Sequence, residues 1–178
     1  MLNVKIGYDS CCDFDECAFE LHSFNRRHKN FLHPDDVSDE LNEKIQNGRA
    51  FYVSYYEHGN CLWFRANSNV PAGVEFQWDG RKIAGIVEYV DEYEVENMDE
   101  AIDSFLKVYT DWANGNCYYC SITDDNGEFI DSCGGFIGSE HLADYLADII
   151  GDKDFVLNDD FSWLQSEIEN KMKEVSNG

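Results

Sequence analysis

The chain has 178 residues, of which 36 are acidic and 13 basic, so its formal net charge is −23. This charge argues against direct binding to nucleic acid or to an anionic membrane, because like charges repel. Hydrophobic residues make up 43% and aromatic residues 15%, which excludes a disordered chain and provides for a core. We expect one domain over residues 1–178, with a weak sub-boundary near 91–97, where acidic residues crowd.

The compartment is indicated by features that the chain lacks. Its start has neither the basic residues nor the long apolar run of a signal peptide, and no stretch reaches 18 apolar residues. The seven cysteines are odd in number, which favours reduced thiols over a disulfide framework. We therefore expect a cytoplasmic protein with no membrane association and no cofactor. The oligomeric state cannot be read from the sequence.

Strands dominate the first half of the chain. Alternating apolar and polar residues, broken by turn residues, predict strands at 2–6, 17–24, 50–56, 61–66, 74–78 and 81–90. Residues 50–56 and 61–66 are predicted to form one hairpin, and residues 74–78 and 81–90 a second one around Asp79-Gly80. A helix is predicted over 36–47, because Val37, Leu41 and Ile45 recur every four residues before a closing glycine.

Helices are more frequent in the second half. The clearest helix begins at Asn97, whose capping partner is Glu100, and ends at Gly115. A hairpin of residues 117–122 and 128–131, a tight connection at 134–138, and helices at 139–150 and 160–175 complete the prediction. The expected fold class is α+β: an antiparallel sheet of hairpins, with three to four helices packed on one face or at the ends.

Metal and catalytic sites are not expected. Cys117 and Cys120 have the spacing of half a zinc site, but residues three apart on a strand face opposite sides. The acidic loop at 124–128 lacks the ligand spacing of a calcium loop and is predicted to be a hairpin turn. No hydrolase, metalloprotease or phosphate-loop motif is present, so we expect no catalytic residue.

A basic cluster interrupts the acidic chain at Arg26, Arg27, His28 and Lys29. One interpretation is an anion site, because arginine binds phosphates and carboxylates through two parallel hydrogen bonds. The other is a structural role, in which the cluster forms ion pairs with the acidic segment. The excess of acids favours the structural interpretation.

The acidic segment itself is the strongest functional feature. Residues 83–152 contain seventeen acids and one base, Lys107, interleaved with apolar residues at structural periods, so the segment should fold. Regular structure would hold its carboxylates at fixed spacing, as DNA holds its phosphates. The candidate partner-binding residues are Glu94, Glu96, Asp99, Glu100, Asp103, Asp111, Asp124, Asp125, Glu140, Asp144, Asp148 and Asp152.

Three stretches also form recognisable motifs. They are Cys17-Ala-Phe-Glu-Leu-His-Ser-Phe-Asn-Arg-Arg-His-Lys-Asn-Phe31, Ser54-Tyr-Tyr-Glu-His-Gly-Asn-Cys-Leu-Trp63, and Gly115-Asn-Cys-Tyr-Tyr-Cys-Ser-Ile122 with Asp131-Ser-Cys-Gly-Gly-Phe-Ile-Gly138. Together they resemble a largely uncharacterised family of small acidic proteins from bacteriophages and mobile elements. The resemblance implies a role in the host bacterial cytoplasm, where such proteins often block host defences, as antirestriction and anti-CRISPR DNA mimics do.

Two functional hypotheses follow. The first is a non-catalytic anti-defence inhibitor whose acidic surface mimics DNA or RNA and blocks a basic, nucleic-acid-binding host protein, either a nuclease or a CRISPR effector. The second is a protein that processes a small molecule or a nucleic acid. Its site would combine Arg26, Arg27, His28 and His58 with the turn Asp131-Ser132-Cys133.

Overall fold

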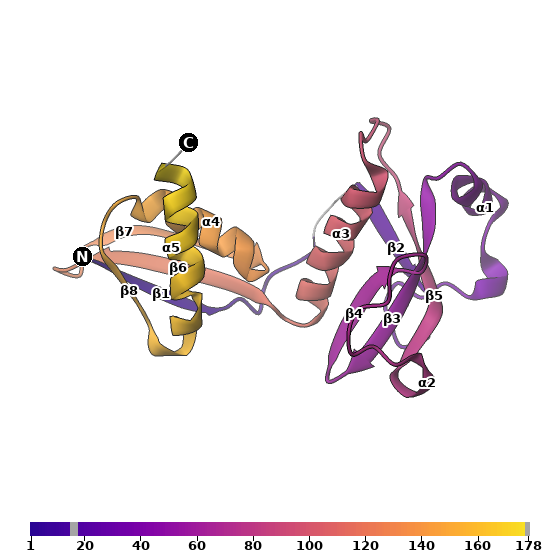
Figure 1. Ribbon diagram of the computed structural model, residues 1–178, viewed down its shortest axis with the longest axis horizontal. Coiled ribbons are helices and arrows are strands. Elements are labelled where there is room, and N and C mark those ends of the chain that lie inside the picture. Colours follow the sequence, from indigo (N-terminus) through magenta and orange to yellow (C-terminus); the bar gives the residue numbers. More distant parts are fainter. Residues whose placement is uncertain (15–17, 177–178) are drawn as a thin grey trace. The chain divides into compact units, whose positions relative to one another are not determined.

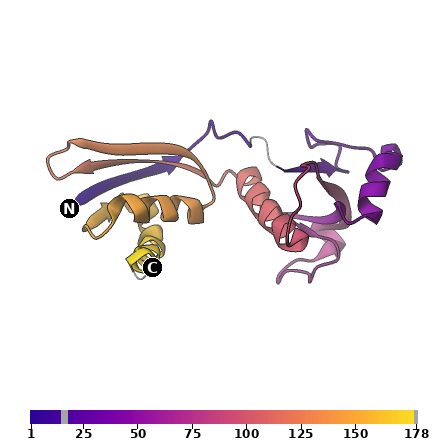
Figure 2. The same cartoon turned by 90° about the horizontal axis from the view of Figure 1, so that it is seen from above.

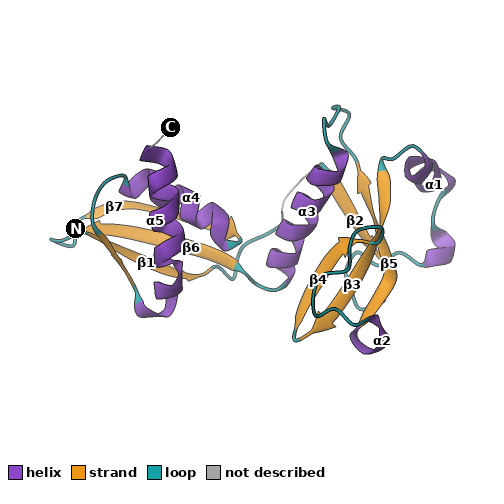
Figure 3. Ribbon diagram, in the orientation of Figure 1, coloured by secondary structure: helices purple, strands orange, loops and turns teal. Residues whose placement is uncertain are grey.

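The structure is a computed structural model that describes residues 1–14 and 18–176 (Figure 1). The chain forms two compact units. Unit 2 is the continuous segment Asp15–Thr110, and unit 1 combines Met1–Phe14 with Asp111–Gly178, so unit 2 is an insertion into unit 1. Each unit contains a four-stranded sheet and helices (Figure 3), which confirms the predicted α+β fold class.

This division differs from the single domain that the sequence predicts. The two boundaries lie between residues 14 and 15 and between residues 110 and 111. The acid-rich residues 91–97 are instead a loop inside unit 2, between a strand and a helix of that unit. Crowded acids therefore mark a solvent-exposed loop here, not a division between units.

Unit 1 is built around the first strand of the chain. Its elements are β1 (Leu2–Tyr8), β6 (Cys117–Asp124), β7 (Phe129–Ile137), α4 (Ser139–Ile150), β8 (Phe155–Leu157), a 3-10 helix (Asp159–Leu164) and α5 (Gln165–Ser176). The strand order is β7-β6-β1-β8, and only the β1–β8 pair is parallel. Helices α4 and α5 cover one face of this sheet (Figure 2), where their apolar sides close the core with Val4, Ile122 and Leu146.

Unit 2 has helices on both faces of its sheet. Its elements are β2 (Phe19–Ser23), a 3-10 helix (Pro34–Asp36), α1 (Asp39–Gln46), β3 (Ala50–His58), β4 (Asn60–Arg65), α2 (Phe76–Asp79), β5 (Gly80–Tyr89) and α3 (Met98–Ala113). The strand order is β2-β5-β3-β4, and every pair is antiparallel. Leu41 of α1 packs on Ile86 on one face, and Phe105 of α3 packs on Phe19 on the other.

Most predicted elements are present. The helices predicted from 36, 97 and 139, and the hairpins at 50–66 and 117–131, are confirmed with shifts of a few residues. The strand predicted at 17–24 is observed from Phe19, and its first residue, Cys17, lies outside the described residues. Among the described helices, none combines the length and apolar character needed to cross a membrane.

Two local predictions are wrong. Residues 74–78 were expected to form a strand in a hairpin with residues 81–90, but they enter the short helix α2. In the structure Phe76 of α2 packs on Phe64 of β4, a contact between distant segments that local alternation does not reveal. Residues 134–137 extend β7, where a connection was expected. Gly135, at φ 78°, accommodates the irregular register between β6 and β7.

Candidate functional site

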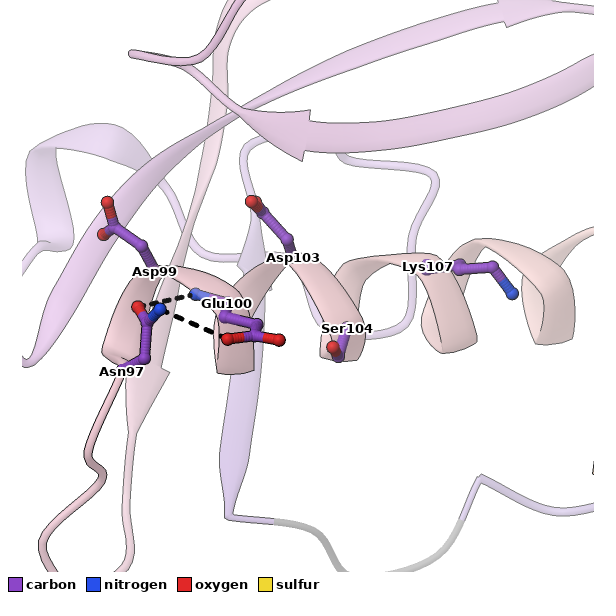
Figure 4. A pocket seen from close by; sticks show the side chains of 6 residues that line it. All are labelled: Asn97, Asp99, Glu100, Asp103, Ser104 and Lys107. Atoms are coloured by element: carbon purple, nitrogen blue, oxygen red, sulfur yellow. Dashed lines mark hydrogen bonds between the residues drawn. The ribbon is translucent and has the colours of Figure 1, made fainter. Parts of the chain in front are cut away.

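The first acidic candidates lie at the start of α3. Asn97 caps the helix: its side-chain oxygen accepts the backbone N–H of Glu100, and its amide donates to the Glu100 carboxylate (Figure 4). The bond to Asn97 satisfies one helix N–H that would otherwise lack a partner, as the sequence predicts, whereas the Glu100 carboxylate returns to the Asn97 side chain and not to its backbone N–H. Glu94, Glu96 and Glu100 are exposed and form no ion pair with any described residue. The first turn of α3 and the loop before it therefore present three exposed carboxylates.

Two further candidates on α3 have a structural role instead. Asp99 and Asp103 lie one turn apart and both contact Arg65 of β4, at 2.9 Å and 2.7 Å. The Arg65 side chain is only 12% exposed. The hydrogen bond from Arg65 to Asp103 is the main reason that the pKa of Arg65 is raised above its usual value. These two carboxylates connect α3 to the edge strand β4, and their charge is partly neutralised there.

The acids of unit 1 are more numerous relative to its bases. Residues 1–14 and 111–178 contain 17 acids against four lysines and no arginine. Glu140, Asp144 and Asp148 recur every four residues and are all exposed on α4. Lys171 of α5 contacts this row, with its Nζ 2.9 Å from Asp144 and 3.9 Å from Glu140. One lysine thus serves two of the three carboxylates.

Asp148 and Asp152 continue the acidic surface of unit 1 beyond this lysine. Both are exposed, and neither forms an ion pair within the described part of the chain. Asp125, on the turn between β6 and β7, is also exposed and lies 3.2 Å from the N-terminal amine. These three carboxylates remain accessible to a partner.

Other acidic candidates hold turns together. Asp124 accepts the backbone N–H groups of Asn126 and Glu128, both at 2.8 Å, and the bond from Glu128 is the main cause of its lowered pKa. The predicted hairpin turn at 124–128 is therefore confirmed. Asp111 is half-buried and accepts a hydrogen bond from the Asn116 amide at 3.1 Å. The carboxylates of Asp111 and Asp124 are thus both engaged in hydrogen bonds within the protein.

The turn that carries the basic cluster of Arg26, Arg27, His28 and Lys29, called the basic turn below, is held in place by His28. His28 Nδ1 lies 2.8 Å from the hydroxyl of Ser23, which is fully buried, and the His28 ring packs edge-on against Tyr55 and Trp63. Burial lowers the pKa of His28, although the nearby Glu57 opposes the shift. Asn25 closes the turn by accepting the backbone N–H of Arg27 at 3.1 Å. The backbone of the turn is therefore well fixed.

The charged side chains of this turn are open to solvent. Arg26, Arg27 and Lys29 are exposed, and none forms an ion pair with a residue that the structure describes. The structural interpretation, in which the cluster pairs with the acidic segment, has no contact of this kind to support it. The turn instead displays three cations on a chain that has only thirteen.

The residues of the alternative site are divided between the two units. Asp131, Ser132 and Cys133 belong to β7 of unit 1, where Asp131 accepts a hydrogen bond from the Tyr145 hydroxyl at 2.8 Å. The basic turn belongs to unit 2. His58, also in unit 2, lies 3.0 Å from Asp79. The structure does not bring this set together within either unit.

The cysteines agree with the expectation that Cys117 and Cys120 diverge. Cys120 is part of the core beneath α4 and α5, whereas Cys117 lies outside that cluster and interacts with Cys12 of the N-terminal segment of unit 1. Cys11 is exposed, and Cys17 lies outside the described residues. Cys133 is instead the cross-strand neighbour of Cys120.

One grouping of polar residues was not predicted. Glu20 and His22 of β2 and Glu88 of β5 place one potential metal-ligand atom each within 4.8 Å of one another. Burial opposes the ionisation of Glu88, but hydrogen bonds from Lys44 and His22 outweigh it and lower its pKa. The sequence signal was weak, because Glu88 is far from the other two and only strand register brings them together.

Comparisons with known proteins do not assign this chain to a family. No family model, no curated protein and no solved structure matches it. The resemblance to acidic phage proteins therefore stays a prediction, and the functional argument depends on the residues themselves.

Proposed function

We propose that the protein is a non-catalytic anti-defence inhibitor from a phage or mobile element. In this proposal it acts in the host bacterial cytoplasm, where its carboxylates occupy the nucleic-acid-binding surface of a basic host protein. The target class is a nuclease or a CRISPR effector, because such proteins are built to hold a row of phosphates.

The charge of unit 1 is the observation that carries this proposal. Its 17 acids face only four lysines, far beyond the charge of magnitude about 2–8 that keeps a small domain soluble. The row on α4 repeats about every 6 Å along the helix axis. One DNA strand carries a phosphate about every 3.4 Å of axis, so the row is spaced like every second phosphate.

The structure also narrows the set of acids that would contact a target. Asp99 and Asp103 are engaged by Arg65, and Asp111 and Asp124 hold turns. We therefore assign the contact to exposed acids of unit 1: Asp125, Glu140, Asp144, Asp148 and Asp152. Glu94, Glu96 and Glu100 are exposed in unit 2 and form a separate candidate surface.

The test compares two variants that lose the same charge. In the first, Glu140→Gln, Asp144→Asn and Asp148→Asn neutralise the α4 row. In the control, Asp36→Asn, Glu40→Gln and Glu43→Gln neutralise three exposed acids of unit 2. Proteins captured from bacterial lysate are released with rising salt or with competing duplex DNA, and their DNA cleavage is assayed with and without the inhibitor.

We expect the α4 variant to bind the target about tenfold more weakly or worse, since charge pairs at such interfaces are individually strong. The control variant should bind like the wild type. Added DNA should displace the protein, and inhibition of cleavage should fall in parallel with binding. Binding that neither salt nor duplex DNA weakens would contradict mimicry.

A second candidate function is favoured by the basic turn. Arg26, Arg27 and Lys29 are exposed on a fixed backbone and have no ion-pair partner among the described residues. This arrangement suits an anionic small molecule or a nucleic-acid phosphate. The double variant Arg26→Ala/Arg27→Ala separates the two proposals, because it should abolish anion binding and leave the α4-dependent contact intact.

A further inference from the structure

The cluster formed by Glu20, His22 and Glu88 lies on the face of the unit 2 sheet that α1 covers. Glu20 and His22 are two residues apart on β2, so their side chains leave the same face. Glu20 is directly opposite Glu88 of β5 in the strand register. The two carboxylates are therefore cross-strand neighbours of like charge, an arrangement that destabilises a sheet unless a cation lies nearby.

The side chain of Lys44 already lies beside Glu88, one of these two facing carboxylates. The Nζ atom of Lys44 on α1 lies 2.6 Å from one Glu88 oxygen, and His22 Nε2 lies 2.6 Å from the other. Among the ion pairs of the described residues, none joins Lys44 to Glu20, which is exposed. One lysine thus balances one of two facing carboxylates, in a protein with an excess of 23 negative charges.

The three groups have the chemistry of a metal site with an open position. An imidazole nitrogen and two carboxylates are ligands that Zn²⁺ accepts, and three protein ligands leave the fourth place for water. Ligand atoms around a tetrahedral zinc ion lie roughly 3.4 Å apart. The three ligand atoms lie within 4.8 Å of one another, and a bound ion would replace the 2.6 Å hydrogen bond between His22 Nε2 and Glu88 Oε1.

We propose that His22, Glu20 and Glu88 form a binding site for a divalent transition-metal ion of the zinc class, and that Lys44 occupies its place when no metal is bound. The ion would bridge β2 to β5 with twice the charge of the lysine. This site is independent of the acidic contact surface proposed above.

Direct metal binding tests this site. The protein is stripped with a chelator, and Zn²⁺ binding is measured by equilibrium dialysis and by titration calorimetry. Co²⁺ serves as a second probe, because its absorption spectrum reports its ligands and geometry. An acidic surface binds divalent ions weakly at many places, so the component of interest is the one that saturates at one ion per chain.

Four single variants distinguish a built site from general attraction. His22→Gln and Glu20→Gln should each weaken this component by about 100-fold or more, since loss of an outer-sphere partner alone costs 10–100-fold. Lys44→Met should strengthen it about tenfold, because a competing unit charge is removed. His58→Gln is the matched control, since His58 also faces a carboxylate, Asp79, but has no third ligand in the part of the chain that the structure describes.

Glu20 is exposed, so Glu20→Gln keeps the test valid if the His22 variant does not fold. Circular dichroism of the metal-free variants checks their folding. The proposal is overturned if wild-type protein shows no one-to-one component with Zn²⁺ or Co²⁺, or if that component survives both ligand variants. It is equally overturned if Lys44→Met leaves the affinity unchanged.

Discussion

Arg65 of β4 holds Asp103 of α3 through two parallel hydrogen bonds, 2.7 Å from Nε to Oδ1 and 2.8 Å from Nη2 to Oδ2. A paired geometry of this kind is specific to arginine, because the planar guanidinium matches a carboxylate edge. Asp99, one turn earlier on the helix, contacts the same group. The acid-rich start of α3 is thereby attached to the edge of the sheet.

The first prediction concerns this attachment. Arg65→Met should lower the free energy of unfolding by about 1 kcal/mol, a value kept small because Asp99 and Asp103 are more than half exposed and solvent screens them. The loss should shrink at high salt, which also screens the repulsion between the two freed carboxylates. Urea unfolding at two salt concentrations measures both effects.

Arg65→Lys provides a graded comparison, because it keeps the charge but loses the planar fork. We expect it to fall between wild type and Arg65→Met. Arg81→Met, which removes an exposed arginine from β5, should have little effect. A larger loss from Arg81→Met than from Arg65→Met would contradict the structural role assigned to Arg65.

The second prediction concerns pH and His28. Burial holds the folded-state pKa of His28 below the ordinary value of 6.5, so at mildly acidic pH the unfolded chain binds the extra proton more readily. The stability associated with neutral His28 is therefore complete above about pH 6.5. It is lost as the pH falls through the folded-state pKa.

His28→Gln should remove this dependence. The variant should be less stable than wild type by about 1 kcal/mol at pH 7.5, because the contact with buried Ser23 is lost. The difference between the two proteins should narrow toward pH 5. Urea unfolding over this range gives the measurement, with His58→Gln as an exposed control, and a difference that stays constant with pH would argue against the assignment.

The third prediction concerns thiol reactivity. Burial is the main factor that raises the pKa of Cys117 to about 12 and that of Cys120 to about 11, so neither forms a thiolate at neutral pH. Cys11 and Cys133 are exposed. With a chromogenic disulfide reagent, the exposed thiols should react quickly in native protein, and the buried ones only in denaturant.

Single serine variants make this measurable without a total thiol count. Cys133→Ser should remove one thiol from the fast phase, whereas Cys120→Ser should remove one only from the phase seen in denaturant. Fast loss of a thiol on Cys120→Ser would mean that the core around α4 opens readily.

Local patterns predicted much of the secondary structure. The apolar stripe and the Asn97 cap define α3, because both depend on residues within a few turns of one another. The strand predicted at 74–78 shows the limit of such patterns. Its alternation fits a strand, yet the segment enters the helix α2, where Phe76 packs on Phe64 of β4.

Contacts between distant residues could not be predicted from periodicity. The acids of α3 were correctly placed on a helix, yet the pairing of two of them with Arg65 depends on how α3 packs against β4. Glu20 and Glu88 meet only because β2 and β5 adopt one register among several. For the same reason, nothing in the sequence indicated that β1 pairs with β6, because all of unit 2 lies between these two strands in the sequence.

The pairing of β1 with β6 determines the order in which the two units can fold during translation. Strand β1 is translated before unit 2, but both of its neighbours, β6 and β8, are translated only after Thr110. Unit 2 is continuous and can complete its sheet while β1 still has two open edges. An unpaired strand of alternating apolar residues is prone to association with other chains. The nascent protein is therefore most prone to aggregation while unit 2 is being synthesised, because β1 is then unpaired.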